Sequence, residues 1–223
     1  AGTPSKGITA TYESGTHKGS KTVTPGVAQK EVTVSGITAA DKVYDGNNSA
    51  MVNVSTATIT GKETGDDLTV SVAAGSTFDS ADAGSRTVTL GTLTLGGTSD
   101  GNYTLATAGN QTAAAANITA RDLTVKPDSG QRKTFGDADP ALTYAYSGEV
   151  SGETPVFDGA LSRAEGEDVG QYDITLGTLA MMNHDRSGFK ASNYTLKMVS
   201  PAVKFEITKG TYTGSTPTKT VNI

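Results

Sequence analysis

Cysteine and tryptophan are absent from this sequence of 223 residues, and histidine occurs only twice. The lack of cysteine excludes disulfide bonds and thiolate metal sites. The two histidines belong to no Ser-His-Asp or Cys-His pattern, which argues against a hydrolase and against a metal centre of several imidazoles. Without tryptophan an aromatic-rich sugar-cleaving cleft is not expected, so Glu165, Glu167 and Asp168 are interpreted as a solvated acidic turn. The sequence predicts no enzyme and no required cofactor.

Clusters of positive charge and long apolar runs are also missing. The net charge is −5, and the basic residues form no patch that would attract nucleic acid. No apolar run is long enough to span a membrane, so we expect no membrane insertion by this segment. The chain does not begin with a signal peptide, and we expect it to be a fragment of a longer protein.

Threonine and glycine are abundant, whereas apolar residues make up only 35% of the chain. That share is below the usual value for a globular domain, so any core must be small and thin. A composition rich in threonine and glycine and poor in helix formers suits extracellular β modules better than a cytosolic enzyme. We therefore expect an extracellular protein.

The two halves of the chain repeat each other. "GSRTVTLGTLTL" at 84–95 matches "GQYDITLGTLAM" at 170–181, and each is followed by Asn-Tyr-Thr-Leu. Two homologous domains joined almost without a linker are therefore predicted. The expected boundaries are an arm or linker from a preceding repeat at 1–30, a first domain at 31–120, a second at 121–208, and the start of the next repeat or a linker at 209–223.

Apolar residues alternate with polar ones along most of the chain, the period of a β-strand. Short alternating runs are separated by Gly, Asp, Asn and Ser, which form turns. The sequence predicts an all-β fold, two tandem Ig-like β-sandwich domains, with β-grasp-like domains as the alternative. Even positions are apolar before Gly91 and Gly177 and odd positions after them, so each glycine is predicted to lie at a bulge or corner.

The stretch "ITAADKVYDGNNSA" contains Tyr44, Asp45 and Gly46 and resembles the start of YDG domains. The second half, with "KTFGDADPALTYAYSG", resembles an MBG domain of the Tyr-Gly-X type. Phe135 stands there in place of the tyrosine, where an aromatic ring can still pack. The resemblance implies tandem repeats of large bacterial surface proteins of the adhesin type, and it implies no catalytic residues.

The Tyr-Asp-Gly stretch is interpreted as a strand end and tight turn, with Tyr44 packed inward and Gly46 providing the turn geometry. The alternative is calcium binding, because carboxylate and amide oxygens are the ligands that calcium prefers. Its candidate ligands are few and lack the ladder of an EF-hand: Asp45, Asn47, Asp137 and Asp139.

Other residues recur at matched positions of the two halves. Tyr103 and Tyr194 are predicted to pack in the cores, since a leucine follows each of them two residues later. Lys42 and Lys133 recur, as do Asn102 and Asn193, and an alternative explanation is a lysine–asparagine isopeptide bond. The loop at 181–189 has the least repetitive sequence and is the candidate partner loop, through Met182, His184, Arg186 and Phe189.

Two functions remain open at this stage. The first is a rigid spacer whose partners are the neighbouring repeat domains of the same chain. The second is an adhesion module that binds a host glycan or a host protein.

Overall fold

The computed structural model describes residues 8–15, 17–23, 26–184 and 188–211. It divides into two compact units, Ala1–Thr119 and Ala120–Ile223. The described residues form β-strands and two single-turn 3-10 helices, so the predicted all-β fold is confirmed. None of these described helices is long and apolar enough to cross a membrane.

In the described residues of the first unit there are thirteen strands. They are β1 (Ile8–Ser14), β2 (His17–Val23), β3 (Lys30–Ser35), β4 (Thr38–Ala39), β5 (Lys42–Val43), β6 (Val52–Asn53), β7 (Thr58–Thr60), β8 (Thr69–Val72), β9 (Thr77–Phe78), β10 (Gly84–Thr89), β11 (Leu93–Gly96), β12 (Tyr103–Leu105) and β13 (Ala113–Thr119), with η1 (Asp100–Asn102) before β12.

The part of the second unit that the structure describes contains nine more strands. They are β14 (Arg121–Pro127), β15 (Arg132–Thr134), β16 (Tyr144–Ser147), β17 (Val156–Asp158), β18 (Ser162–Arg163), β19 (Gly170–Thr175), β20 (Ala180–Met182), β21 (Tyr194–Met198) and β22 (Lys204–Thr208), with η2 (Ala191–Asn193) before β21.

Both units use the same set of sheets. A four-stranded sheet has the order β5-β13-β10-β9 in the first unit and β15-β22-β19-β18 in the second. A three-stranded sheet, β12-β3-β7 or β16-β14-β21, holds the first long strand of the unit. A third sheet pairs β8 with β11, or β17 with β20. The first unit adds a β4-β6 pair and the β1-β2 hairpin.

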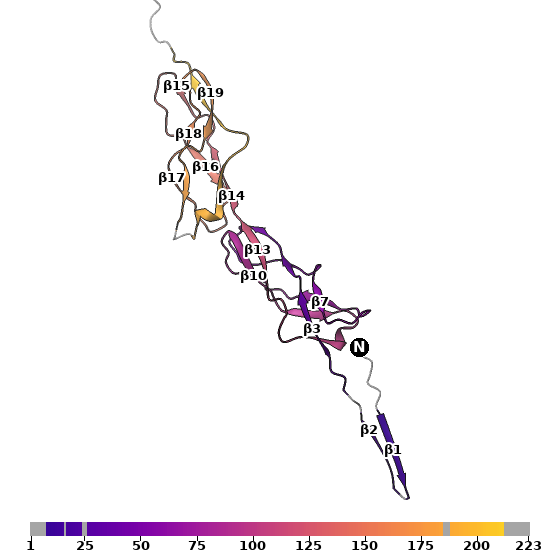
Figure 1. The fold of residues 1–223 in the computed structure, drawn as a ribbon. Coiled ribbons are helices and arrows are strands. Elements are labelled where there is room, and N and C mark those ends of the chain that lie inside the picture. Colours follow the sequence, from indigo (N-terminus) through magenta and orange to yellow (C-terminus); the bar gives the residue numbers. More distant parts are fainter. Residues whose placement is uncertain (1–7, 16, 24–25, 185–187, 212–223) are drawn as a thin grey trace, which may run out of the picture. The chain divides into compact units, whose positions relative to one another are not determined.

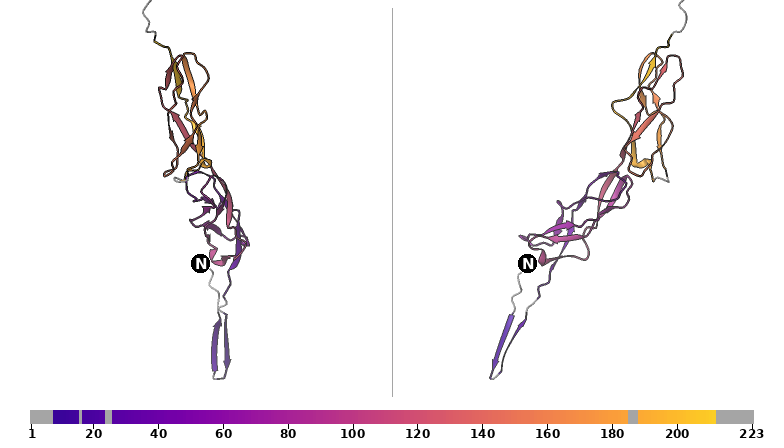
Figure 2. Two further views of the ribbon diagram at one scale, coloured as in Figure 1. Left: turned by 90° about the vertical axis from the view of Figure 1, so that its left-hand side faces the viewer. Right: turned by 180° about the vertical axis from the view of Figure 1, so that it is seen from behind.

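The two larger sheets lie toward opposite ends of each unit (Figure 1 and Figure 2). In the second unit β14 lies at one end and β15 and β19 at the other; in the first unit β3 and β7 lie at one end and β10 and β13 at the other (Figure 1). Each unit therefore receives the chain at one end and releases it at the other. This arrangement is consistent with β-sandwich domains, and the Ig-like topology stays a prediction.

The chain changes sheets at Gly91 and Gly177. β10 pairs with β13 and β9, whereas β11, two residues after Gly91, pairs with β8. A Cβ atom at Gly91 would lie 2.3 Å from the carbonyl oxygen of Ala73, so only glycine fits this close approach. Gly177 has a φ of +56° at the same place in the second unit, between β19 and β20. Each glycine thus occupies a corner between two sheets.

The cores are small, as the composition predicts. In the first unit Val32, Leu68 and Tyr103 form a buried cluster. In the second unit the buried members of a cluster are Val125, Leu161, Ile174, Leu179, Phe205 and Ile207. The alanine-rich segment 113–119 is a strand despite its helical propensity, because Ile118 and every second residue before it face inward.

Candidate functional site

The Tyr-Asp-Gly stretch forms a turn held by a lysine. Tyr44 is buried at the end of β5, with 4% of its surface exposed. The Lys42 Nζ donates to Asp45 Oδ1 at 2.8 Å and to the carbonyl oxygen of Asn47 at 2.7 Å. The same carboxylate oxygen accepts from the Asn47 amide at 3.1 Å, and Gly46 has a φ of +80°. The turn therefore needs Asp45 and Gly46 for its backbone conformation.

Three of the four residues proposed for calcium, Asp45, Asn47 and Asp139, already bind other groups through their side-chain oxygens. Burial tends to raise the pKa of Asp45, but hydrogen bonds from Lys42 and Asn47 together hold it below its ordinary value. Asp139 accepts from two cationic side chains, while Asp137 is exposed. No group of three or more acidic, histidine or cysteine residues in the described ranges could hold a metal ion.

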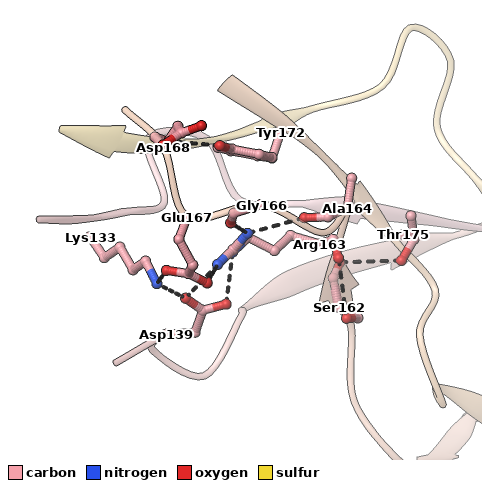
Figure 3. Close-up of polar contacts among 10 residues, drawn as sticks. All are labelled: Lys133, Asp139, Ser162, Arg163, Ala164, Gly166, Glu167, Asp168, Tyr172 and Thr175. Atoms are coloured by element: carbon pink, nitrogen blue, oxygen red, sulfur yellow. Dashed lines mark hydrogen bonds and ion pairs between the residues drawn. The ribbon is translucent and has the colours of Figure 1, made fainter. Parts of the chain in front are cut away.

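The equivalent place in the second unit holds a cluster of four charges (Figure 3). Asp139 accepts from Lys133 Nζ at 2.7 Å and from Arg163 Nε at 2.7 Å. Glu167 accepts from Arg163 Nη2 at 2.6 Å and also pairs with Lys133. The two cationic side chains are only 4% and 7% exposed, whereas the two carboxylates are 44% and 67% exposed. Buried positive charge is thus covered by carboxylates at the surface.

The cluster shifts the pKa of all four of its members. The hydrogen bond from Arg163 is the main reason why the pKa of Asp139 is lowered, and the one from Lys133 has that role for Glu167. Hydrogen bonding to Asp139 likewise raises the pKa of Lys133 and of Arg163. All four groups are therefore charged over a wide pH range. Because the charges cancel, the cluster has the character of a structural ion-pair network rather than of an acid–base pair.

Strand register shows that Arg163 replaces an aromatic residue of the first unit. Phe78 lies opposite Val88, and Arg163 lies opposite the matching Ile174. In the first unit the Lys42 Nζ lies 5.6 Å from the centroid of the Phe78 ring, a cation–π contact. In the second unit a guanidinium takes the place of that ring, so bridging carboxylates are needed to keep two cations together.

The sequence alone did not reveal the role of Arg163. Ala73 and Ala160 are equivalent, because each lies against one of the two corner glycines. Phe78 is five residues beyond the first, but Arg163 is only three beyond the second, so the two are offset in a direct alignment. Glu167, interpreted as part of a solvated turn, is indeed exposed, but it also pairs with two buried cations. The signal that could have revealed it was the replacement of an aromatic residue by a cationic one near a lysine that recurs in both units.

Tyr103 fastens a loop of the first unit to its core. The residue is 4% exposed. Its hydroxyl accepts from the amide of Glu63 at 3.0 Å and donates to the carboxylate of Asp66. That hydrogen bond to Asp66 is the main cause of a raised pKa for Tyr103.

Tyr194 makes the same contacts in the second unit. Its hydroxyl accepts from the Val150 amide at 2.9 Å and donates to Glu153 Oε2 at 2.8 Å. Burial, followed by the bond to Glu153, raises the pKa of Tyr194 to about 12. Both tyrosines therefore combine a core ring with a hydroxyl that binds a loop, the one between β7 and β8 in the first unit and the one between β16 and β17 in the second.

The aromatic position of the turn differs between the units. The amides of Tyr44 and Phe135 donate to Thr119 and Thr208, the last residues of β13 and β22, at 2.8 Å each. Yet Phe135 is 56% exposed, so its ring does not pack inward as that of Tyr44 does. The backbone of the turn is kept while the side chain changes its place.

The recurring lysines and asparagines have separate structural roles. Lys42 binds its turn, and Lys133 belongs to the charge cluster. Asn102 and Asn193 end the single-turn helices η1 and η2, where their backbone N–H groups donate to the carbonyl oxygens of Ser99 and Lys190 at 3.0 Å. Lys42 contacts carboxylate and turn oxygens as well as the Phe78 ring, and Lys133 contacts two carboxylates, so we interpret both lysines as members of ion pairs.

The candidate partner loop is only partly at the surface. Met182 is 50% exposed, and His184 pairs with Phe189 in an isolated β-bridge. Phe189 is 1% exposed and stacks on Tyr194 with ring centroids 5.0 Å apart, so its ring is not presented to a partner. Arg186 lies outside the described residues. A cavity of about 260 Å³ lies beside the loop, lined in part by His184 and Phe189.

Comparison with known proteins identifies both units. The class that the fold defines is a tandem of two all-β repeat units. Residues 28–114 match the YDG domain and residues 123–203 match the MBG domain (YGX type), so the chain is a YDG domain followed by an MBG domain. Both are families of non-catalytic repeat or binding modules, associated with surface proteins of the adhesin type. No curated protein and no solved structure matches the chain.

Proposed function

We propose that this chain is a non-catalytic spacer segment of a large extracellular adhesin, on a bacterial cell surface or secreted from it. Its partners in this role are the neighbouring repeat domains of the same chain. The segment needs no cofactor, and it holds a distal binding region away from the cell.

The path of the chain through each unit supports this proposal most directly. The sheet with the first long strand and the sheet with the last strand lie at opposite ends of the unit (Figure 1). Units built in this way can be joined in series without a returning connection. Between β13 and β14 only Ala120 lies outside a strand. A one-residue connection has few backbone torsions, so we expect little hinge bending there.

Spin labels can test the expected stiffness. The chain has no cysteine, so Thr60→Cys in β7 and Thr195→Cys in β21 would provide the only two labelling sites. Both positions are exposed. We expect a narrow distribution of label–label distances by double electron–electron resonance. A matched variant with Gly-Ser-Gly-Ser inserted after Ala120 should give a clearly broader one. An equally broad distribution in the parent chain would rule out a stiff spacer.

The second candidate function is adhesion to a host glycan or host protein. The cavity beside the loop at 181–189 favours it, since this loop is the least alike between the two halves and binding sites often lie beside surface loops. Its polar lining includes Asn183, Lys190 and Ser192. A glycan array probed with the chain and with an Asn183→Ala/Lys190→Ala variant tests it. Retention of the same hits by the variant would exclude this cavity.

A further inference from the structure

A cleft opens along one side of the first unit, between β7 and β8. Its volume is about 350 Å³, within the range of small-ligand sites. Both strands are at the edges of their sheets, so the sandwich is not closed by hydrogen bonds at this side. The lining is mostly apolar, with Leu68 buried and the others half-buried: Val54, Ala57, Ile59, Leu68 and Val70.

On β7 the lining residues correspond to tyrosines of the second unit. Ile59 lies opposite Val34 in β3, and Tyr146 lies opposite the matching Val125 in β14. Ala57 precedes Ile59 by two residues, as Tyr144 precedes Tyr146, so each pair shares one face of its strand.

On β8 the lining residue corresponds to a phenylalanine. Val70 lies opposite Leu95, and Phe157 lies opposite the matching Met181. The Tyr144 and Tyr146 rings contact the Phe157 ring with centroids 5.7 and 5.3 Å apart, joining β16 to β17. The second unit therefore has three aromatic rings in contact, with that of Tyr146 partly at the surface, where the first unit has alanine, isoleucine and valine.

One cationic group lies at the cleft. Lys62 lines it, and its Nζ donates to the carbonyl oxygen of Asp66 at 3.1 Å. The matching residue of the second unit is Glu149, since each precedes the amide that donates to the core tyrosine. The first unit thus combines an unfilled ring-sized space with a positive charge where its counterpart has a negative one.

We propose that this cleft binds a planar aromatic ring that carries an anionic group. The ring lies between β7 and β8, where it replaces the cross-strand ring contacts of the second unit, and the anion lies at Lys62. A cleft of about 350 Å³ with mostly apolar walls has room for one or two aromatic rings. This binding is independent of the spacer role, because a stiff array can have it or lack it.

Binding can be measured on the whole chain with the fluorescent dye anilinonaphthalene sulfonate, an aromatic anion. Val70→Phe and Ala57→Tyr introduce the residues of the second unit and should each lower the affinity for the dye by about tenfold or more. Thr58→Tyr is the matched control, since Thr58 lies between the lining residues on the opposite, exposed face of β7. It should bind the dye as the parent chain does.

The charge is tested separately. Lys62→Glu introduces the residue of the second unit and should lower the affinity for the anionic dye several-fold, while the affinity for the neutral dye N-phenylnaphthylamine is unchanged. Phenylpropionate should displace the anionic dye better than cyclohexylpropionate, which has the same charge but no planar ring. If the peptide acetyl-Gly-Gly-Phe displaces it better still, the ring comes from a polypeptide end; if not, from a free aromatic acid.

A reciprocal variant guards against misfolding. Tyr144→Ala, Tyr146→Ile and Phe157→Val together with Glu149→Lys should reproduce the cleft and its positive charge in the second unit and add a second dye site, while thermal unfolding confirms that both units remain folded. The proposal is overturned if the parent chain does not bind the dye, if folded Val70→Phe binds it unchanged, or if Thr58→Tyr weakens it as much as Ala57→Tyr does.

Discussion

Replacing Tyr194 by phenylalanine removes one hydroxyl and two hydrogen bonds while keeping the buried ring. The lost bonds are a neutral one from the Val150 amide, at 2.9 Å, and a charge-assisted one to Glu153, at 2.8 Å. A neutral bond contributes about 1 kcal/mol and one to a charged group about 1.5–3 kcal/mol. Glu153 is half-buried, so water replaces part of the second bond. We expect Tyr194→Phe to destabilise the second unit by about 2–3 kcal/mol.

Alkaline pH supplies an independent check of the same hydrogen bonds. The pKa of Tyr194 is raised to about 12, from an ordinary value of about 10. A raised tyrosine pKa means that folding favours the neutral phenol, so its stabilisation is complete below pH 10 and is lost as pH rises toward 12. The difference in stability between the parent chain and Tyr194→Phe should therefore be constant up to about pH 10 and shrink above it.

The assay is urea unfolding followed by circular dichroism, with native-state hydrogen exchange at the Val150 amide to assign the effect to this loop. Tyr172→Phe is the matched control, since that hydroxyl makes one exposed hydrogen bond, to the carbonyl oxygen of Asp168 at 2.7 Å. It should cost less than about 1 kcal/mol. A loss for Tyr194→Phe no larger than that of the control, or a difference that does not shrink above pH 10, would refute the reasoning.

Two further predictions concern the charge cluster and the corner glycine. Because the pKa values of Asp139 and Glu167 are lowered in the folded state, these carboxylates stabilise the second unit above about pH 4, and this stabilisation is lost as the pH falls through their folded-state pKa values. In urea titrations at several pH values, Asp139→Asn/Glu167→Gln should remove most of this acid sensitivity, and an unchanged pH profile would contradict the prediction. Gly91→Ala should destabilise the first unit by about 2 kcal/mol or more, because its Cβ would lie 2.3 Å from the Ala73 carbonyl oxygen. Gly170→Ala, where nothing lies within 4 Å, should change the stability by less than about 0.5 kcal/mol in thermal unfolding, and equal effects of the two substitutions would disprove the steric argument.

The fold was predictable where the signal is local. Alternation along each strand marks the buried face, and the shift of parity at Gly91 and Gly177 marks the point where one strand ends and the next begins in another sheet. Comparison of the two halves also corrected local propensity, since the alanine-rich segment at 113–119 is a strand like its alternating counterpart. The alternation of apolar and polar residues, with its period of two, is visible in the sequence even though the cores are thin.

The candidate site was less predictable because it depends on contacts across strands. The partners of Arg163 include Asp139, which is 24 residues away, and the deletion before Arg163 hides its correspondence to Phe78. Phe189 was expected at a partner surface, but it is buried against Tyr194. An aromatic residue in a loop carries no mark of which way it faces, since its neighbours in sequence do not determine the packing partner.

The exchanges between the two units occur in sets, and this follows from the electrostatics of the shared frame. A guanidinium placed at Phe78 alone would bring a second positive charge close to Lys42, so the exchange requires bridging carboxylates, as in the second unit. Likewise the rings of Tyr144 and Tyr146 both contact the ring of Phe157, so removing Phe157 takes this ring contact from both tyrosines. Differences of function between such repeats should therefore lie in groups of residues that face each other across strands, and only a comparison of strand register can find them.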